Sequence, residues 1–458
     1  MNKVILVEFN ELCPALLDQW MASGDLPNFK RLHAVSDVFV TQADEVEPAN
    51  LEPWIQWYSM HTGMPYSQHK VFHLTDGPRA GHPDIWSLLH AQGKSVWNCS
   101  SMNARQFAYP GSAYLPDPWC TSEAPHPPEL AAFHRFVSHQ VREYSNSGQS
   151  LGLKPVMDFL LFMLRNGLRL TTVVAVLKQY LSEFRSSGKT RWQRVALQDR
   201  FLFDVFRSYF KRLRPDFATF FANSTAHLQH SHWRHMDPDK YTVKPSALEQ
   251  EQYKDAILFG YRQMDRLLGE MMALAEEDTR VMFATALSQQ PYLKYEHIGG
   301  HNFYRPRNIE QLFAKLGLRA LSLQPVMTHQ FLAQFQNESD AQQARKVLGS
   351  LLLDGKPVFG FDDGEPGSVY FGSQIRTVVA ADSVLKSSSE PDFELGFFDL
   401  FYKIEGLKSG RHHPDGCLWI QTGRHTPHEG KVSILDVLPT VTKLLNVPVG
   451  GYAGRALV

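Results

Sequence analysis

The stretch KVILVEFNELCP, residues 3–14, decides the fold class of this 458-residue chain. Its first seven residues form an apolar run that only Glu8 and the leading lysine interrupt. Such a run is typical of a strand that is buried on both faces of a parallel sheet. A polar turn with Pro14 follows, and a segment with helical spacing then ends at Gly24. The stretch therefore predicts a strand followed by a helix, which is the repeating unit of an α/β fold.

The same alternation recurs along the chain. A helix, a glycine and a strand are predicted within residues 83–100, and a late helix is predicted at 432–447. Three further apolar runs end in polar residues, as the first strand does, and they lie at 217–222, 281–286 and 417–421. We therefore expect an α/β fold with a mostly parallel central sheet and helices on both faces, in which these three strands and the first one are neighbours.

Two long stretches do not have the pattern of core strands and helices. The first consists of helical patterns, and the second mixes short helices with turns rich in Gly, Asp and Ser. We interpret them as a helical insertion and a mixed cap over the sheet. The resulting division is core 1–127, helical insertion 128–212, core 213–304, mixed cap 305–395 and core 396–458.

The charge balance and the apolar pattern bear on two classes of partner. The chain has 46 Lys and Arg against 47 Asp and Glu, which gives no argument for nucleic acid or an acidic membrane as the main partner and leaves a local basic patch open. The most apolar stretch, 156–181, is interrupted by Asp158, Arg165 and Arg169, so no integral membrane span is expected. An amphipathic or buried helix pair is the preferred interpretation, and peripheral membrane contact is the alternative.

The cysteines and the first residues indicate the compartment. Cys13, Cys99, Cys120 and Cys417 are widely scattered and form no CxxC pair, so reduced thiols are expected. The apolar run near the start is too short for a signal peptide, and acidic residues follow it. Both features favour a cytoplasmic protein.

Several motifs, taken in their order, resemble the alkaline phosphatase superfamily, and most closely its type I phosphodiesterase/nucleotide pyrophosphatase branch. The segments that carry the resemblance are VILVEFNELCPALLDQWMASGDLPNFKRL, TGMPYSQHK, IWSLLHAQGKSVW, HHPDG and SILDVLPTVTKLLNVP with GYAGRAL. The resemblance implies a hydrolase in which two zinc ions hold a phosphate or sulfate ester while a Thr or Ser at a helix start attacks it. Six protein ligands, mostly Asp and His, would hold the two metals.

Most of the implied positions carry other residues. The first ligand Asp falls on Asn10, the nucleophile falls on Pro53, and the Asp of a D-x-x-x-H motif falls on Ala226. The strand-end Asp-His-Gly falls on residues 286–288, Ala-Leu-Ser. Only His230 and His412 keep strong ligands, and zinc needs three or four close together. We therefore predict no dinuclear zinc site and assign no catalytic residue.

Polar residues at the strand exits still predict a pocket at the carboxyl edge of the sheet. The expected ligand is small and polar. An anionic ligand is favoured, because Arg and His side chains and a helix start supply positive potential. The candidate ligand-binding residues are Asn10, Glu52, Asn223, His230, Gln289, Arg411 and His412.

The sequence leaves both the cofactor and the activity open. No cofactor is assigned, and a rebuilt site for a single divalent metal is the alternative, with His230 and His412 as ligands. Other residues near strand ends that could join such a site are Glu8, Glu11, Glu52, His227, His297, His301, His413, His425 and His428. The chain is expected to recognise an anionic ester or a glycan-type ligand with an altered two-metal site. The alternative is a pseudoenzyme that binds or scaffolds.

Overall fold

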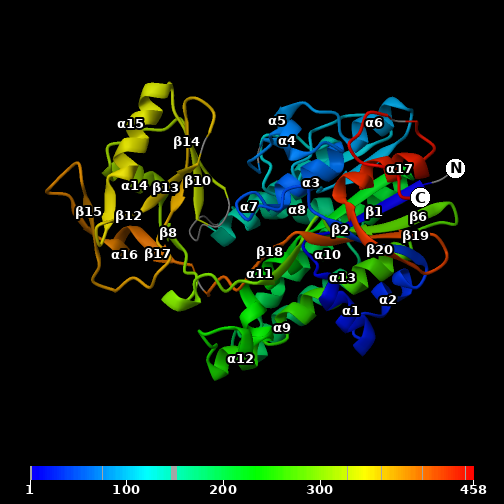
Figure 1. The fold of residues 1–458 in the computed structure, drawn as a ribbon, viewed down its shortest axis with the longest axis horizontal. Helices are drawn as coiled ribbons and strands as arrows, with labels where there is room; N and C mark the ends of the chain where they lie inside the picture. The colour runs from blue at the N-terminus through cyan, green and yellow to red at the C-terminus, as the bar shows by residue number, and fades with distance from the viewer. Residues whose placement is uncertain are drawn as a thin grey trace.

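The computed structural model describes residues 3–74, 76–145, 152–326, 329–362, 364–404, 406–448 and 450–458. These residues form two bodies, a larger one built around the central sheet and a smaller one drawn in yellow and orange in Figure 1. Both ends of the chain belong to the larger body. The ligand-binding residues expected from the sequence all lie within the described ranges.

The larger body contains an eight-stranded sheet that is mostly parallel. Its strand order is β20-β2-β19-β6-β1-β5-β3-β4. The strands are β1 (Lys3–Phe9), β2 (Ser36–Gln42), β3 (Val96–Cys99), β4 (Ala113–Leu115), β5 (Phe217–Ala222), β6 (Thr279–Ala284), β19 (Asp415–Gln421) and β20 (Thr426–Ser433). β19 runs antiparallel to both β2 and β6, and the remaining pairs are parallel. The expected fold class is confirmed, and the four strands expected to be neighbours are adjacent in the order β19-β6-β1-β5.

The apolar run of β1 supplies both faces of the sheet. Ile5, Val7 and Phe9 pack into one hydrophobic cluster, whereas Val4 and Leu6 pack into the other, because successive side chains in a strand point to opposite faces. The helices of the first face are α1 (Pro14–Ser23), α2 (Pro27–His33), α7 (Ala131–Ser145), α8 (Leu153–Arg165), α10 (Val195–Leu213), α11 (Ser224–Met236) and α13 (Ala256–Met272). Those of the second are α3 (Pro53–Thr62), α6 (Ile85–Ala91) and α17 (Val437–Leu444).

The two stretches set apart in the sequence have different architectures. Within 128–212 the elements of the described residues are helices, and α9 (Leu170–Arg185) completes the set with α7, α8 and α10. The smaller body has two four-stranded antiparallel sheets, β13-β14-β10-β9 and β12-β11-β15-β16, and its own hydrophobic cluster. Its elements are α14 (Ile309–Lys315), β9 (Ser322–Pro325), β10 (Gln330–Gln334), α15 (Glu338–Gly349), β11 (Leu351–Leu353), β12 (Lys356–Pro357), β13 (Phe359–Asp362), β14 (Ser368–Ser373), β15 (Val384–Ser387) and β16 (Glu394–Gly396).

The smaller body includes residues on either side of the stretch 305–395. Phe397, Leu400 and Phe401 pack into the cluster of the smaller body, together with Tyr304. They belong to α16 (Phe397–Leu400) and to β17 (Phe401–Lys403), which pairs with β8 (Tyr304–Pro306). The smaller body therefore extends a few residues beyond each end of 305–395.

Several chain segments meet at the edge of the sheet where the parallel strands end. β1 and β5 end there, and β6 leads into the short strand β7 (Ser288–Pro291). β7 pairs with β18 (Gly410–His413), which leads into β19. Because β19 runs antiparallel, its amino end lies at the same edge as the carboxyl ends of its neighbours. This edge is where ligands bind in open α/β sheets.

Candidate metal-binding and ligand-binding site

Three side chains converge at this edge. Glu11 follows β1, His230 lies in α11 and His412 lies in β18. Each offers one ligand atom, and the three atoms lie within 4.8 Å of one another. Glu11 is buried, and the side chains of His230 and His412 are 24% and 13% exposed. A carboxylate and two imidazoles are ligands that Zn²⁺ and similar metals take.

The backbone at Glu11 has an unusual conformation. Its φ is +64°, in the left-handed region that residues other than Gly, Asn and Asp seldom adopt. This conformation costs about 1–2 kcal/mol for an ordinary residue. Non-glycine residues held in this way cluster at binding sites. Here the turn places the Glu11 carboxylate among the two histidines.

The two imidazoles present the same ring nitrogen to Glu11. His230 Nδ1 lies 3.1 Å from the carbonyl oxygen of Gly410, which can only accept, so Nδ1 carries the proton. His230 Nε2 then lies 3.1 Å from Glu11 Oε2. His412 Nε2 lies 3.6 Å from the same oxygen, while its Nδ1 lies 3.5 Å from Glu52 Oε2. Histidines that bind metals are commonly oriented by such a contact at the other ring nitrogen.

Other polar groups hold Glu11 in place. Gln289 Nε2 donates to Glu11 Oε2, and Asn10 Nδ2 donates to Oε1 at 2.9 Å. The Glu11 carbonyl accepts from Gln229 Nε2 at 2.8 Å, and Gln229 accepts in turn from Tyr261. The carboxylate therefore has donors on both oxygens and a fixed backbone, which is the support that a metal ligand requires.

The cluster contains an ionised carboxylate and a neutral imidazole near pH 7. Burial raises the pKa of Glu11, but His412 and His230 outweigh burial and lower this pKa to about 2. Burial lowers the pKa of His412 to about 3, so this imidazole is neutral near pH 7. An ionised carboxylate therefore faces the ring nitrogens of histidines at short range. A divalent cation bound between them would satisfy all three groups.

Asn10, on which the sequence resemblance placed a metal ligand, lies in a hydrogen-bond network. Asn10 Nδ2 donates to Asn223 Oδ1 at 2.8 Å as well as to Glu11, and Asn10 Oδ1 accepts from Trp57 Nε1 at 2.8 Å. Both polar atoms of the Asn10 amide are thus occupied by neighbours. Ala226 and the Ala-Leu pair at 286–287 are buried and offer no side-chain ligand. Among the described residues, Glu11, His230 and His412 are the group of three side chains that could hold a metal ion.

The helix α3 begins at Pro53, on which the sequence resemblance placed the nucleophile. Pro53 is the first residue of α3, and Glu52 is its N-cap. Pro at this position suits the helix because its missing N–H would have no partner there. It supplies no hydroxyl or thiol for attack on an ester. Burial raises the pKa of Glu52 to about 7, although 29% of its side chain is exposed.

The structure brings together most residues expected from the sequence. Asn10, Asn223, His230, Gln289 and His412 are joined by direct contacts or through Glu11, and Glu52 contacts His412. Arg411 is exposed, and the alternation of side chains along β18 directs it away from the face that carries His412. Glu11, which the sequence placed only in a wider group of alternatives, is at the centre.

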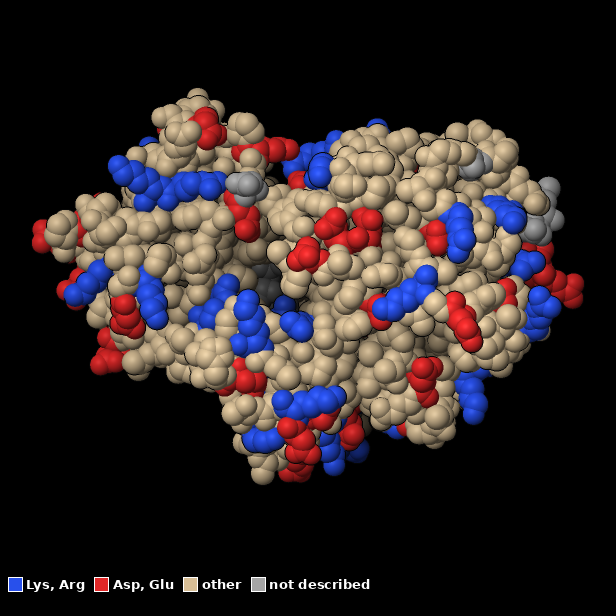
Figure 2. Space-filling model, viewed as in Figure 1, with Lys and Arg blue, Asp and Glu red and all other residues tan. Residues whose placement is uncertain are grey.

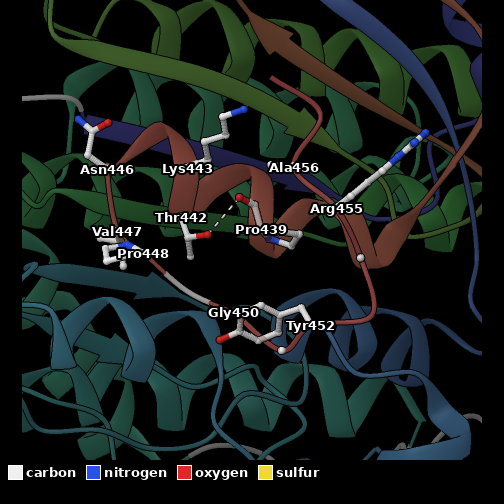
Figure 3. Close-up of a pocket in the computed structure, with 12 residues that line it drawn as sticks. Pro439, Thr442, Lys443, Asn446, Val447, Pro448, Gly450, Tyr452, Arg455 and Ala456 are labelled. Atoms are coloured by element: carbon white, nitrogen blue, oxygen red, sulfur yellow. Dashed lines mark hydrogen bonds between the residues drawn. The ribbon is translucent and has the colours of Figure 1, made fainter.

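The molecular surface has a hollow between the two bodies, and Lys and Arg side chains gather along its lower rim (Figure 2). A different cavity of about 560 Å³ lies between α17 and the last residues of the chain, around Tyr452 (Figure 3). Tyr452 lies against Gly63, which ends α3, whereas Glu52 lies at the opposite end of that helix. The cavity of Figure 3 is therefore separate from the histidine cluster.

Comparisons with known proteins find similarity only among solved structures. No protein-family model matches the chain, and no curated protein matches it. The chain is similar to phosphonoacetate hydrolase from Sinorhizobium meliloti 1021 in complex with phosphonoacetate, with 13% identity, a TM-score of 0.44, and coverage of 97% of this chain and 96% of that one.

Two other structures are similar over nearly the whole chain. One is murine ectonucleotide pyrophosphatase/phosphodiesterase 5 in complex with AMP, with 11% identity, a TM-score of 0.41, and coverage of 99% and 98%. The other is the alkaline phosphatase PafA, with 11% identity, a TM-score of 0.46, and coverage of 100% and 98%. All three are members of the alkaline phosphatase superfamily, which the sequence resembles.

Proposed function

We propose that this chain recognises an anionic ester, a phosphate or sulfate ester or a glycan that carries one, at a centre holding a single divalent metal. Glu11, His230 and His412 are the proposed metal ligands. One observation carries the proposal: two histidines from different elements direct Nε2 at the same buried carboxylate oxygen, at 3.1 and 3.6 Å. An ordinary ion pair would use one histidine and would not need the left-handed backbone at Glu11.

The groups around the centre favour an anion. A bound divalent metal would give the site a net positive charge, since Glu11 is the ligand that carries negative charge. Lys408 lies close enough to lower the pKa of both Glu52 and His412. Glu52 opposes an anion when it is ionised, and its pKa of about 7 leaves it partly protonated near neutral pH. The start of α3 adds the positive end of a helix dipole.

The metal, when bound, would act as a Lewis acid that polarises an ester oxygen. The residues of this chain would hold the ester beside it, with Lys408 as a nearby cation. Hydrolysis in the manner of the resembling family is not expected, because Pro53 supplies no nucleophile and Asn10 is engaged with Asn223 and Trp57. The same two observations favour the second candidate, a protein that binds its ester without cleaving it.

Metal content and ligand binding test the proposal together. The purified full chain should take up one Zn²⁺ or Mn²⁺ per molecule in elemental analysis, and titration calorimetry should show inorganic phosphate or sulfate binding only after the metal is added. Glu11→Gln and His412→Ala should each reduce metal affinity by at least about 100-fold, since each removes a ligand. His425→Ala is the matched control, because that histidine is exposed and lies outside the cluster.

The outcomes separate the candidates. Two tightly held metals per chain would show that the centre is dinuclear, and unchanged metal binding in Glu11→Gln would remove the carboxylate from it. Aryl phosphodiester and aryl sulfate substrates decide between the two functions. Turnover that requires the metal supports an esterase, and binding without turnover supports the non-catalytic protein.

A further inference from the structure

Two helices of the region between β4 and β5 expose an apolar stripe to solvent. On α8 the exposed side chains are Leu153, Met157, Leu160, Leu161 and Leu164, and on α9 they are Leu170, Val174, Leu177, Tyr180, Leu181 and Phe184. Their spacing of three and four residues places each set on one side of its helix. The two helices are joined by the short turn of residues 166–169.

These stripes are not the faces by which the helices pack on the molecule. α8 packs inward through Phe159, Phe162 and Met163, and α9 turns Thr172, Gln179 and Glu183 inward. Exposed fractions reach 86% for Phe184, 77% for Leu170 and 69% for Leu164. Monomers seldom expose rows of large apolar side chains such as these without a partner for them. The stripes therefore indicate a docking surface.

Positive charge surrounds the stripes. Residues 153–194 contain eight Lys and Arg and two Asp and Glu, although the whole chain has a net charge of −1. Lys154, Arg165, Lys178 and Arg185 are exposed on the same two helices. Of the two acidic residues, Glu183 is already paired with Arg194. The surface thus combines exposed leucines and a phenylalanine with an excess of cations.

A small hollow adjoins the stripe of α9. It has a volume of about 360 Å³, and its lining consists of Lys178, Leu181, Ser182, Arg185 and Ser186. The two cations can hold phosphate oxygens by charge and hydrogen bonds, whereas the hydroxyls of Ser182 and Ser186 already contact Thr190. Leu181 belongs both to this lining and to the apolar stripe. An apolar chain and an anionic group would therefore meet side by side at this place.

We propose that α8 and α9 dock on an anionic lipid bilayer, with the apolar stripes inserted among the acyl chains and with Lys178 and Arg185 at the phosphates of the headgroups. Amphipathic helices with leucine and phenylalanine on one face and Lys and Arg beside it bind membrane interfaces in this way. A second copy of the chain fits the surface less well, because a symmetric contact would bring like charges together. No helix among the described residues is long and apolar enough to cross a membrane.

Vesicle co-sedimentation of the full chain tests this inference. Vesicles of phosphatidylcholine alone are compared with vesicles that contain about one third phosphatidylglycerol. The wild-type chain should sediment with the anionic vesicles, and added salt should weaken this binding. Leu177→Asp with Phe184→Asp should lower the partition coefficient at least about tenfold, because carboxylates would enter the apolar layer. Lys178→Glu with Arg185→Glu should abolish the preference for anionic vesicles.

The controls keep the test specific. Leu177 and Phe184 are 63% and 86% exposed, so their replacement should leave the melting temperature unchanged. Leu321→Asp alters a leucine that is 72% exposed in the smaller body and should bind vesicles as the wild type does. Absence of wild-type binding to anionic vesicles would overturn the inference. A wild-type dimer in light scattering that Leu177→Asp with Phe184→Asp converts to a monomer would overturn it too, in favour of a second copy.

Discussion

Replacing Asn10 by aspartate tests whether a hydrogen-bond network has taken the place of a second metal. Asn10 is almost fully buried, and its Nδ2 lies 2.9 Å from Glu11 Oε1 and 2.8 Å from Asn223 Oδ1. Asn10→Asp removes both donors and sets a second carboxyl group against an ionised one. The substitution also introduces the residue type that the sequence resemblance implies at this position.

The size of the effect follows from the distance and is limited by protonation. Two carboxylates about 3 Å apart repel by roughly 5 kcal/mol at an effective dielectric constant of 20. The new side chain avoids this repulsion by binding a proton. The substitution then lowers the free energy of unfolding at pH 7 by at most about 4 kcal/mol, which corresponds to a rise in the pKa of the new aspartate from about 3.9 to 7. The folded state would bind more protons than the unfolded state, so stability should fall as the pH rises from 4 to 7.

Urea denaturation at pH 4, 5.5 and 7.5 measures this change, with Asn10→Ala as the matched control. Alanine loses the same donors without adding charge, so its cost should vary little with pH. The difference in free energy of unfolding between the two variants should grow to about 3–4 kcal/mol at pH 7.5. It should shrink when Zn²⁺ is added, because a bound cation offsets the repulsion between the two carboxylates. An Asn10→Asp variant that stays as stable as Asn10→Ala at every pH would refute the placement of Asn10 beside Glu11.

Three further substitutions give distinct outcomes. Burial raises the pKa of Asp199 to about 7, so this carboxyl makes the folded chain less stable as the pH rises from 4 to 7. Asp199→Asn should therefore raise the free energy of unfolding by up to about 4 kcal/mol at pH 8 and by almost nothing at pH 4. Urea denaturation at the two pH values measures this difference. Glu8→Ala should lower the free energy of unfolding by about 3–5 kcal/mol and leave metal affinity unchanged. The reason is that the fully buried Glu8 accepts a hydrogen bond from Ser101 at 2.7 Å and lies 2.8 Å from His61. A loss of stability below about 1 kcal/mol would contradict this account. A Cβ at Gly410 would meet the backbone oxygen of Gln229 at 2.5 Å, so Gly410→Ala should move the Gly410 carbonyl that orients His230. Calorimetry should then show metal affinity reduced about tenfold. Unchanged affinity would show that this carbonyl is dispensable.

The sheet could be predicted from the sequence because its signals are local. The apolar runs of β1, β5 and β6 are buried on both faces, and each ends in polar residues, as a central parallel strand does. β2 and β20 were not identified from their sequences. β20 is largely exposed and carries Lys431 and His428, so it has no apolar pattern that would mark it as a strand. It depends on pairing with β2, which is a contact distant in sequence.

The candidate site could be predicted only in part. His230 and His412 were identified because motif spacing fixes them relative to neighbouring elements. Arg411 was grouped with His412 because the two are adjacent in sequence, yet in a strand adjacent side chains point in opposite directions. The pairing of His412 with Gln289 across β18 and β7 sets which of the two residues enters the site.

Glu11 shows why the centre itself could not be located from the sequence. The motif register gave the ligand position to Asn10, one residue earlier, and a regular strand would place neighbours on opposite faces. The chain leaves the strand after Phe9, and Glu11 adopts a φ of +64° that swings its side chain to the edge occupied by His230 and His412. No propensity scale favours glutamate in this conformation, and glycine would adopt it at no cost. Two amides and two histidines hold this strained glutamate in place. Its conformation is therefore best explained by what its carboxylate binds, and the proposed metal is assigned to Glu11 for this reason. Glu11→Gln is accordingly the most direct test of the site.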